Sequence, residues 1–328
     1  MGIIRERYKI NRMIRSSKTV FLMAHKNLDL DALGSQLGMY MILKRKKKKC
    51  YLIIDDREHE MGVEKVLKEL EGCIDIIRGE EIDKYMYPRL SKNSLMILDT
   101  NKEELVQNQE VLQKIKNKLI IDHHDLGPTT IKDAMIIDDP ETSSTCEMIT
   151  NLIEYYDVEI ESYYATILLS GIVLDTNNYT LNTNVETYYS SYYLASLGAS
   201  AKKVQYLLKQ ELDDFAERQK LLTDIETINN KVAFTKGPAS KQYRREDLAK
   251  VADTLLFFNN IEASFVVAKI GKDTIGISAR SLGNYDISKI LEKLGGGGDS
   301  TAGAATFENS TITKVEQELK KLIKKEGE

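Results

Sequence analysis

Residues 20–34, with the sequence VFLMAHKNLDLDALG, join a short apolar run to a group of polar side chains and then to a helical pattern. The run Val20–Ala24 is typical of a buried β-strand, and the spacing of apolar residues over Ala32–Leu43 predicts a helix. A buried strand followed at once by a helix is the beginning of a parallel α/β unit. Ligands of such units bind beyond the carboxyl ends of the strands, where this stretch places His25, Asp29 and Asp31.

The rest of the first half repeats this alternation of short apolar runs and helical patterns. Four further runs predict strands of the same parallel sheet: Tyr51–Ile54, Leu95–Leu98, Leu119–Ile121 and Met135–Ile137. From residue 143 to about residue 219 the pattern becomes largely helical. We therefore expect an α/β domain with a parallel sheet, followed by a helical extension and a linker.

A second, smaller α/β unit is predicted from about Lys231 onward. Its expected elements are strands Val232–Thr235, Ser264–Ile270 and Thr274–Ala279, helix Asp286–Leu294, and a solvated terminal helix Thr313–Glu328 to which we assign no function. The boundaries that we expect are residues 1–200 for the first domain, 201–230 for a helical linker and 231–328 for the second domain.

The composition excludes several classes of protein. A formal net charge of −4 argues against a protein that coats long nucleic acids, because such proteins need an excess of Lys and Arg. The cysteines, Cys50, Cys73 and Cys146, have no CxxC spacing, so a disulfide scaffold and a zinc cluster are not supported and a reducing cytoplasm is expected. No apolar run reaches the roughly 18 residues that cross a bilayer, so we expect no membrane contact by this chain itself.

Three of the four histidines follow predicted strands and stand beside carboxylates. His25 follows the first strand, and His123 and His124 follow Leu119–Ile121 together with Asp122. Asp99 closes Leu95–Leu98, and Asp175 ends an apolar helical run. A carboxylate at the end of a buried strand is costly unless a cation compensates its charge.

Each of these carboxylates also has a purely structural interpretation. Asp29 or Asp31 can cap the helix that follows, which explains one carboxylate but not three polar groups. Asp99 can be an ordinary strand-end residue, and Asp175 an ordinary last residue of a helix, although an anion there opposes the helix dipole. The metal interpretation accounts for all of them at once.

Four Asp side chains with two or three His form an oxygen-rich ligand set that suits Mn²⁺ or Mg²⁺. Two divalent cations would balance the four carboxylates of Asp29, Asp31, Asp99 and Asp175 and leave a site able to accept a phosphate. A pair of cations about 3.5–4 Å apart activates a hydroxide and stabilises the leaving oxygen of an in-line displacement. The ligand set therefore predicts hydrolysis of a phosphodiester.

These residues resemble the DHH phosphoesterase family, which is named for the triad present here as Asp122-His123-His124. The likeness covers nearly the whole chain and extends to four further motifs: His25-x3-Asp29-x-Asp31, Asp99-Thr100, Ser143-Ser144-Thr145 and Gly171-Ile-Val-Leu-Asp175-Thr-Asn-Asn-Tyr179. Within the family the chain is most similar to the catalytic part of GdpP-type cyclic di-AMP phosphodiesterases.

The resemblance implies the roles of the site residues. It implies that His25, Asp29 and Asp99 hold one metal, that Asp31, Asp99, His123 and Asp175 hold the other, and that Asp99 bridges the two. It places His124 near the scissile phosphate, so that His124 and Asp99 are the expected catalytic side chains. The implied cofactors are two divalent ions, with Mn²⁺ preferred over Mg²⁺ or Co²⁺, and the implied product is linear 5′-pApA.

The second unit resembles the DHH-associated domain, which implies a substrate-binding role for Ser278, Arg280 and the glycines Gly295, Gly296, Gly297 and Gly298. Glycines let backbone N–H groups approach a phosphate, and a guanidinium pairs with it through two hydrogen bonds. A run of glycines is alternatively a flexible linker. The chain also departs from the family pattern, because Asp299 stands where a His is usual.

Two other functions remain open at this stage. The same metal core serves nanoRNases or phosphatases that act on linear dinucleotides such as pApA, and a nucleotide sensor without catalysis would fit Asp299. The resemblance further implies a homodimer. It also implies that the chain is a cytoplasmic catalytic part of a longer, membrane-tethered protein.

Overall fold

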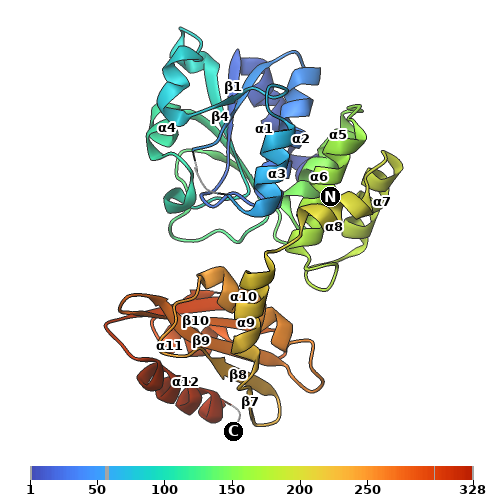
Figure 1. Cartoon of the computed structure of the whole chain (residues 1–328). Helices are drawn as coiled ribbons and strands as arrows, with labels where there is room; N and C mark the ends of the chain where they lie inside the picture. Colours follow the sequence, from blue (N-terminus) through green and yellow to red (C-terminus); the bar gives the residue numbers. More distant parts are fainter. Residues whose placement is uncertain (1, 56–58, 299, 327–328) are drawn as a thin grey trace. The chain divides into compact units, whose positions relative to one another are not determined.

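The computed structural model of the protein describes residues 2–55, 59–298 and 300–326. The chain forms two compact units, Met1–Lys209 and Gln210–Glu328 (Figure 1), and each unit is described here by itself. The α/β fold class expected from the sequence is confirmed for both units.

The first unit is built on a parallel sheet of six strands with the order β3-β2-β1-β4-β5-β6. The strands are β1 (Thr19–Met23), β2 (Lys49–Ile53), β3 (Ile76–Ile77), β4 (Asn93–Leu98), β5 (Asn117–Asp122) and β6 (Met135–Asp138). The chain first proceeds from β1 outward to β3 and then returns to β4, on the other side of β1. The strand order therefore reverses between β1 and β4, and such a reversal is where sheets of this kind bind their ligands.

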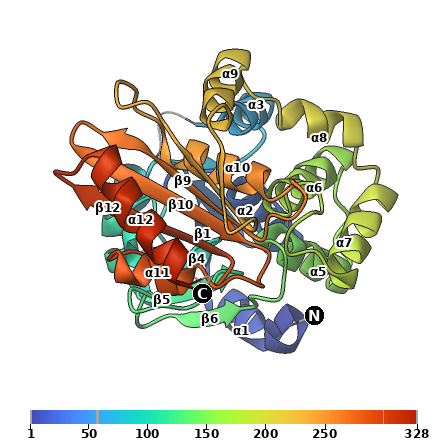
Figure 2. The same ribbon diagram turned by 90° about the horizontal axis from the view of Figure 1, so that it is seen from below.

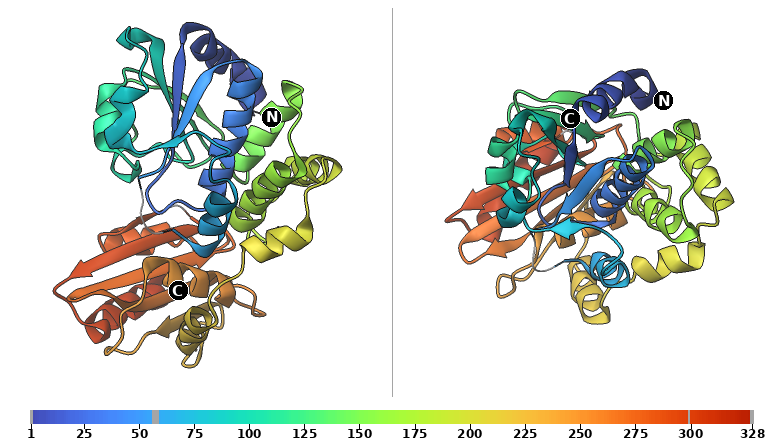
Figure 3. Two further views of the ribbon diagram at one scale, coloured as in Figure 1. Left: turned by 45° about the horizontal axis from the view of Figure 1, so that its top comes forward. Right: turned by 90° about the horizontal axis from the view of Figure 1, so that it is seen from above.

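Helices cover both faces of this sheet because successive strand residues point to opposite sides. Val20 and Leu22 of β1 pack on the face that carries most of the helices, whereas Phe21 and Met23 pack on the other face. The first face carries α1 (Gly2–Ser16), α2 (Leu30–Arg45), α3 (Met61–Glu69), α5 (Thr145–Tyr155), α6 (Ser162–Asp175), α7 (Val185–Ser196) and α8 (Ala201–Leu207) (Figure 3). The second face carries α4 (Gln109–Lys114) and the 3₁₀ turns η1 (Gly79–Lys84) and η3 (Glu103–Leu105). A third turn, η2 (Leu90–Lys92), precedes β4, and Figure 2 shows α1 beside β6 and α5.

Small residues let α2, α5 and α6 approach one another closely. A Cβ atom added to Gly34 of α2 or to Gly171 of α6 would lie 2.6 Å from the Sγ of Cys146 in α5. At Gly171 the added atom would also lie 2.9 Å from the Cα of Asp31. This close packing brings α2 and α6, which carry predicted site residues, against the beginning of α5.

The second unit is a mixed sheet of six strands with the order β11-β12-β10-β9-β8-β7. The strands are β7 (Glu226–Ile228), β8 (Val232–Lys236), β9 (Ala263–Gly271), β10 (Thr274–Ser281), β11 (Gly297–Gly298) and β12 (Ala302–Glu308). The helices of this unit are α9 (Leu212–Gln219), η4 (Lys220–Leu222), α10 (Arg245–Leu255), α11 (Ser288–Lys293) and α12 (Ile312–Glu326). α10 packs on one face of the sheet, and α11 and α12 pack on the other (Figure 1).

The strands expected from apolar runs are confirmed in both units, with ends that move by at most two residues. The sequence patterns gave no sign of α1, β3, α10 or β12. Residues 201–230, for which a helical linker was expected, contain α8 and α9, and the division between the two compact units falls between Lys209 and Gln210. No helix in the described part of the chain has both the length and the apolarity needed to cross a bilayer.

The close approach of α5 and α6 leads to a stability prediction. Gly171→Ala should lower the free energy of unfolding by about 1–3 kcal/mol, because overpacking of this size outweighs the gain of about 1 kcal/mol from helix propensity. Thermal or urea unfolding measures the change. Gly127→Ala is the control, because a Cβ at Gly127 meets no atom within 4 Å. Equal stability of the two variants would contradict the prediction.

Candidate metal centre

The segments that follow β1, β4 and β5 bring the predicted metal ligands to the point where the strand order reverses. His25 follows β1, Asp99 follows β4 and His123 follows β5. Asp29 and Asp31 lie at the start of α2, and Asp175 is the last residue of α6. The carboxyl edge of the sheet and two helix ends thus converge on one site.

Asp99 lies between two groups of side chains and directs one carboxylate oxygen toward each. Its Oδ2 is 3.3 Å from the Nε2 of His25, and its Oδ1 is 3.6 Å from the Nε2 of His123. The backbone of Asp99 has a φ of 62°, a left-handed conformation that is uncommon for residues other than glycine. Such conformations gather at functional sites, where the surrounding structure holds them in place.

Two of three overlapping groups of possible metal ligands among the described residues match the composition expected from the sequence, and the third consists of Asp99, His123 and His124. His25, Asp29 and Asp99 form one group, and Asp31, Asp99, His123 and Asp175 form the other. Within each group, one ligand atom per residue lies within 4.8 Å of all the others. Asp99 belongs to both groups, as a carboxylate that bridges two cations would.

Each group contains a histidine whose Nε2 faces the carboxylates. The Nδ1 of His25 lies 2.6 Å from the backbone oxygen of Lys26, so Nδ1 carries the proton and Nε2 faces the carboxylates. His123 bonds the backbone of Thr142, and its buried Nε2 has no hydrogen-bond partner although it lies 3.2 Å from Asp175. A buried ring nitrogen without a partner beside several carboxylates fits a cation ligand.

The carboxylates of the cluster repel one another when no cation is bound. Burial raises the pKa of Asp31 well above its usual range, and the charges of Asp99 and Asp175 raise it further. Burial likewise raises the pKa of Asp175, with further contributions from Asp29 and Asp99. Divalent cations would remove this repulsion, so the donor set fits a pair of hard metal ions.

His25 and Asp99 behave as an ion pair within the cluster. Burial disfavours a charged imidazole, but the hydrogen bond with Asp99 and the charges of Asp29 and Asp99 raise the pKa of His25 to about 10. Burial works against the charge of Asp99 too, yet the hydrogen bond with His25 keeps the pKa of Asp99 well below its usual value. In the metal-free protein, a protonated His25 therefore supplies part of the positive charge that a bound cation would supply.

The beginning of α5 holds two of the carboxylates. The backbone N–H groups of Thr145 and Cys146 donate to the two oxygens of Asp31 at 2.8 and 2.7 Å. The hydroxyl of Thr145 donates to Oδ1 of Asp99 at 2.9 Å. N–H groups at a helix N-terminus are suited to anions, so α5 fixes Asp31 and Asp99 before any metal arrives.

Asp29 has both of the roles that the sequence left open. Its Oδ1 accepts the backbone N–H groups of Asp31 and Ala32 and caps α2, whereas its Oδ2 lies 3.7 Å from the Nε2 of His25. One oxygen is therefore structural, and the other belongs to the site.

His124 differs from its neighbour His123 in the partner of its ring. Its Nδ1 lies 2.8 Å from Oδ1 of the buried Asp122, and the side chain is 53% exposed. The same Nδ1 lies 4.0 Å from Asp99. Because Nδ1 donates to Asp122, His124 is placed beside the carboxylate cluster without a lone pair directed at it.

The predicted substrate-binding residues lie in the second unit. Ser278 and Arg280 are on the face of β10 that α10 covers, and the Nε of Arg280 pairs with Oδ1 of Asp253 in α10 at 2.9 Å. The Nη1 of Arg280 donates to the backbone oxygen of Ala279 at 2.9 Å. The guanidinium is thus held by Asp253, which the sequence analysis did not single out.

Most of the glycine run is explained by chain packing. Gly295 has a φ of 73° and follows the end of α11, and a Cβ on Gly296 or Gly298 would lie 2.4 or 2.3 Å from backbone oxygens of β12. A Cβ on Gly297 would meet nothing within 4 Å. A Cβ on Gly295 would likewise meet nothing within 4 Å, but the left-handed backbone accounts for that glycine, so Gly297 is the one that neither packing nor conformation explains.

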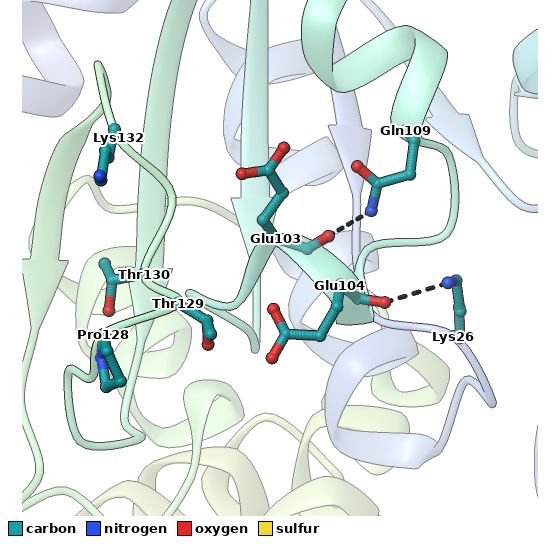
Figure 4. A pocket seen from close by; sticks show the side chains of 8 residues that line it. All are labelled: Lys26, Glu103, Glu104, Gln109, Pro128, Thr129, Thr130 and Lys132. Atoms are coloured by element: carbon teal, nitrogen blue, oxygen red, sulfur yellow. Dashed lines mark hydrogen bonds between the residues drawn. The ribbon is translucent and has the colours of Figure 1, made fainter.

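A pocket of about 590 Å³ lies in the segments that follow the ligands of the first unit (Figure 4). Lys26 directly follows His25, and its Nζ donates to the backbone oxygen of Glu104 at 3.0 Å. Figure 4 shows the Glu104 side chain extending toward the segment that carries Thr129. The side chains around this pocket are exposed and of mixed charge, and we assign it no function.

The structure thus brings His25, Asp29, Asp31, Asp99, His123 and Asp175 together, with His124 beside them. Asp299 lies outside the described residues. Sequence reasoning assigned no role to Thr145, although it belongs to one of the family motifs. The capping pattern of Ser144 and Glu147 places Thr145 at the start of a helix and is the signal that could have identified it. Asn101 donates a hydrogen bond to Asp122, and nothing in the sequence pointed to this residue except its position two residues after Asp99.

Two family models match the chain in succession. The model described as the DHH family, N-terminal domain, matches residues 19–172, and the DHHA1 domain model matches residues 229–326. The first match contains the whole parallel sheet with α2, α5 and most of α6, and the second contains β8 to β12.

Two relatives illustrate the range of proteins that the chain is similar to. It is 33% identical over 320 residues to the cyclic-di-AMP phosphodiesterase GdpP of Geobacillus thermodenitrificans, which corresponds to 96% of this chain and 49% of that protein. It is 26% identical to the bifunctional oligoribonuclease and PAP phosphatase NrnA of Thermus thermophilus, over 94% of this chain and 90% of that protein. The chain spans about half the length of the cyclic-di-AMP phosphodiesterases that it matches.

Solved structures share the fold. An exopolyphosphatase-related protein from Bacteroides fragilis superposes with a TM-score of 0.80 at 22% identity, covering 100% of this chain and 98% of that one. RecJ from Thermus thermophilus, solved in complex with Mn²⁺, gives a TM-score of 0.52 at 14% identity and covers 98% of this chain and 54% of that one. With both family models matched in order and the relatives similar over nearly its whole length, this chain belongs to the DHH phosphoesterase family and carries a DHH domain followed by a DHHA1 domain.

Proposed function

We propose that this phosphoesterase hydrolyses one phosphodiester bond of cyclic di-AMP and releases linear 5′-pApA. The observation that carries the proposal is the position of Asp99, whose two oxygens face two separate His and Asp groups. The choice of substrate is supported by the cyclic-di-AMP phosphodiesterases to which almost the entire chain is similar.

In this proposal His25, Asp29 and Asp99 hold one cation, and Asp31, Asp99, His123 and Asp175 hold the other. When bound, two divalent ions supply Lewis-acid activation of water and of the phosphoryl oxygens. We take Mn²⁺ as the preferred ion and Mg²⁺ or Co²⁺ as alternatives, because the donors are carboxylates and imidazoles without a thiolate. The six side chains would fix the positions of the two cations, and through them the position of a phosphate.

The reaction breaks the bond between phosphorus and one 3′ oxygen. The oxygen of water becomes part of the new 5′-phosphate, and the 3′ oxygen leaves with a proton as a hydroxyl group. His124 lies next to the cluster, and in this proposal it donates a hydrogen bond to the reacting phosphate from Nε2 as a doubly protonated imidazolium, while its Nδ1–H stays on Asp122. Asp31 and Asp99 are kept in place by α5, so they need little rearrangement as the charge develops.

The second unit supplies substrate binding in this proposal. Arg280 pairs with a phosphate oxygen or a base edge, and Asp253 fixes the direction of its guanidinium. Ser278 lies on the same sheet face, and Gly297 leaves its backbone accessible. The homodimer expected from the family resemblance stays a prediction.

A second candidate function is hydrolysis of linear dinucleotides or removal of a phosphate from small nucleotides. It is favoured by the similarity to a relative named as an oligoribonuclease and PAP phosphatase, which extends over 90% of that protein. The metal cluster serves either reaction equally well, because both displace an oxygen at phosphorus.

Loss of the bridging carboxylate tests the metal assignment. Asp99→Asn should lower kcat/KM for cyclic di-AMP with Mn²⁺ by more than about 100-fold, since even residues behind metal ligands are worth about 10–100-fold. Chromatography of the products measures the rate. The control is Asp138→Asn, which removes an exposed carboxylate at the end of β6 outside the cluster. Unchanged turnover by Asp99→Asn would show that the ligand assignment is wrong.

Substrate ranking separates the two candidate functions. The proposal predicts a larger kcat/KM for cyclic di-AMP than for pApA or cyclic di-GMP, measured with the same enzyme and Mn²⁺ concentration. A larger value for pApA would favour the nanoRNase or phosphatase. Tight binding of cyclic di-AMP without any metal-dependent product would favour a sensor instead.

Metal binding should release protons, because several ligands hold protons in the metal-free protein. The pKa of His25 is raised to about 10, so its stabilising proton is fully bound below about pH 6.5 and is lost as the pH rises toward 10. The pKa values of Asp31 and Asp175 are also raised. Cations compete with these protons, and the apparent affinity for Mg²⁺ or Mn²⁺ should therefore increase with pH by up to about tenfold per unit for each proton released.

Calorimetric titration in buffers of different ionisation enthalpy counts the released protons. We expect at least one proton per chain near pH 7 for the unmodified protein and fewer for His25→Asn. In metal-free protein, the difference in Tm between the unmodified chain and His25→Asn should shrink as the pH rises from 6.5 toward 10. Metal binding without proton release would contradict this description of the site.

A further inference from the structure

Asn101 is a buried polar residue that no motif explains. Its side chain is 1% exposed, and it lies two residues after Asp99 in the segment that leaves the carboxyl end of β4. Its Nδ2 donates to Oδ2 of Asp122 at 2.7 Å. The same nitrogen lies 3.1 Å from the backbone oxygen of His124 and 3.4 Å from that of Asp125.

The orientation of the Asn101 amide is fixed from its other end. The hydroxyl of Thr130 donates to Oδ1 of Asn101 at 3.2 Å, so the amide nitrogen must be the atom that faces Asp122. The backbone N–H of Ile131 donates to the backbone oxygen of Asn101 at 2.8 Å. Asn101 therefore connects β4 to both ends of the loop that follows His124.

Asp122 connects Asn101 to His124. Its carboxylate is fully buried, and its Oδ1 accepts from the Nδ1 of His124 at 2.8 Å and from the backbone N–H of His124 at 3.3 Å. Oδ2 accepts from Asn101. A buried carboxylate needs donors on both oxygens, and Asn101 supplies the side-chain donor on the side away from His124.

Two adjacent histidines thereby acquire different properties. His123 bonds a backbone group and directs at the carboxylates an Nε2 that has no hydrogen-bond partner, whereas the Nδ1 of His124 bonds Asp122. The Nδ1 of His124 is 4.0 Å from Asp99, near enough to join the cluster as a ligand if the ring turned away from Asp122. Asp122 prevents this, provided that its own carboxylate stays in place.

We propose that Asn101 is a positioning residue for His124: it anchors Asp122 so that His124 keeps its proton on Nδ1, stays out of the metal shell and presents Nε2 to the substrate. The proposal deepens the proposed function and rests on it only for the role of His124 in turnover. The arrangement of Thr130, Asn101, Asp122 and His124 stands on the hydrogen bonds alone.

The first test is kinetic. Asn101→Ala should lower kcat by about 10–100-fold and leave KM within about twofold, because a residue that orients a catalytic group acts on the reaction more than on binding. Metal stoichiometry should remain at two ions per chain or rise if His124 becomes a ligand. Asn101→Asp, which keeps the volume but turns a donor into an acceptor facing a carboxylate, should be at least as impaired as Asn101→Ala.

The second test needs no turnover. Nitrogen-15 NMR of histidine-labelled, metal-free protein reports the tautomer of each ring, and only four histidines contribute signals. The signal of His124 is identified by its loss in His124→Gln. We expect Nδ1–H in the unmodified protein and a mixture of tautomers in Asn101→Ala. An unchanged tautomer together with an unchanged kcat would overturn the proposal.

A matched control separates positioning from general stability. Asn108 also donates to an aspartate that follows a strand, with its Nδ2 2.5 Å from Oδ2 of Asp55. Asn108→Ala should cost stability through the cap of α4 but leave both kcat and the His124 signal unchanged. Equal loss of kcat in both variants would show that the effect of Asn101 is only structural.

Thr130 provides a variant in case Asn101→Ala does not fold. Thr130→Val removes the donor that orients the Asn101 amide. It should lower kcat by a smaller factor than Asn101→Ala does, and Thr130→Ser should restore kcat.

If the unmodified protein cleaves no dinucleotide, the proposed function fails while the tautomer measurement still decides the role of Asn101. If the unmodified protein is active and neither Asn101 nor Thr130 affects kcat or the tautomer, the inference alone fails.

Discussion

Four carboxylates and two imidazoles share one site at the carboxyl edge of the parallel sheet, and their mutual repulsion is the constraint on which the rest of the arrangement depends. Burial raises the pKa values of Asp31 and Asp175, which means that the metal-free site holds protons where it would otherwise hold uncompensated charge. Bound protons reduce the repulsion between the carboxylates, whereas two divalent cations would cancel it. Because two divalent ions balance the charge of the four carboxylates, the loaded site would be able to accept an anionic phosphate.

Elements that are far apart in the sequence hold these carboxylates together in the fold. The reversal of strand order places the ends of β1 and β4 side by side, and the left-handed backbone of Asp99 turns its carboxylate between two groups of ligands. The N-terminus of α5 neutralises part of the charge of Asp31. Gly171 and Gly34 allow the helices to come close enough for this contact, because a Cβ at either position would strike the side chain of Cys146.

The sequence was sufficient to predict five of the six parallel strands and the six clustered residues, because both signals are local: apolar runs mark buried elements, and charges at the ends of those runs mark the edge where the strands meet. It was not sufficient for contacts that depend on packing. Thr145 donates its N–H to Asp31 across 114 positions, and Asn101 finds Asp122 across 21. β12, which contains several Ala and Gly residues, lacks the alternation that marks a strand, and most of the glycine run proved to follow from strand pairing.

Anomalous diffraction at the manganese edge, from crystals of the unmodified chain soaked in MnCl₂, tests the central claim most directly. The account predicts two peaks about 3.5–4 Å apart, one on each side of the Asp99 carboxylate, with His25 and Asp29 at one peak and Asp31, His123 and Asp175 at the other. His124 should contact neither ion through Nδ1. A single peak, or peaks that lie away from Asp99, would contradict the account.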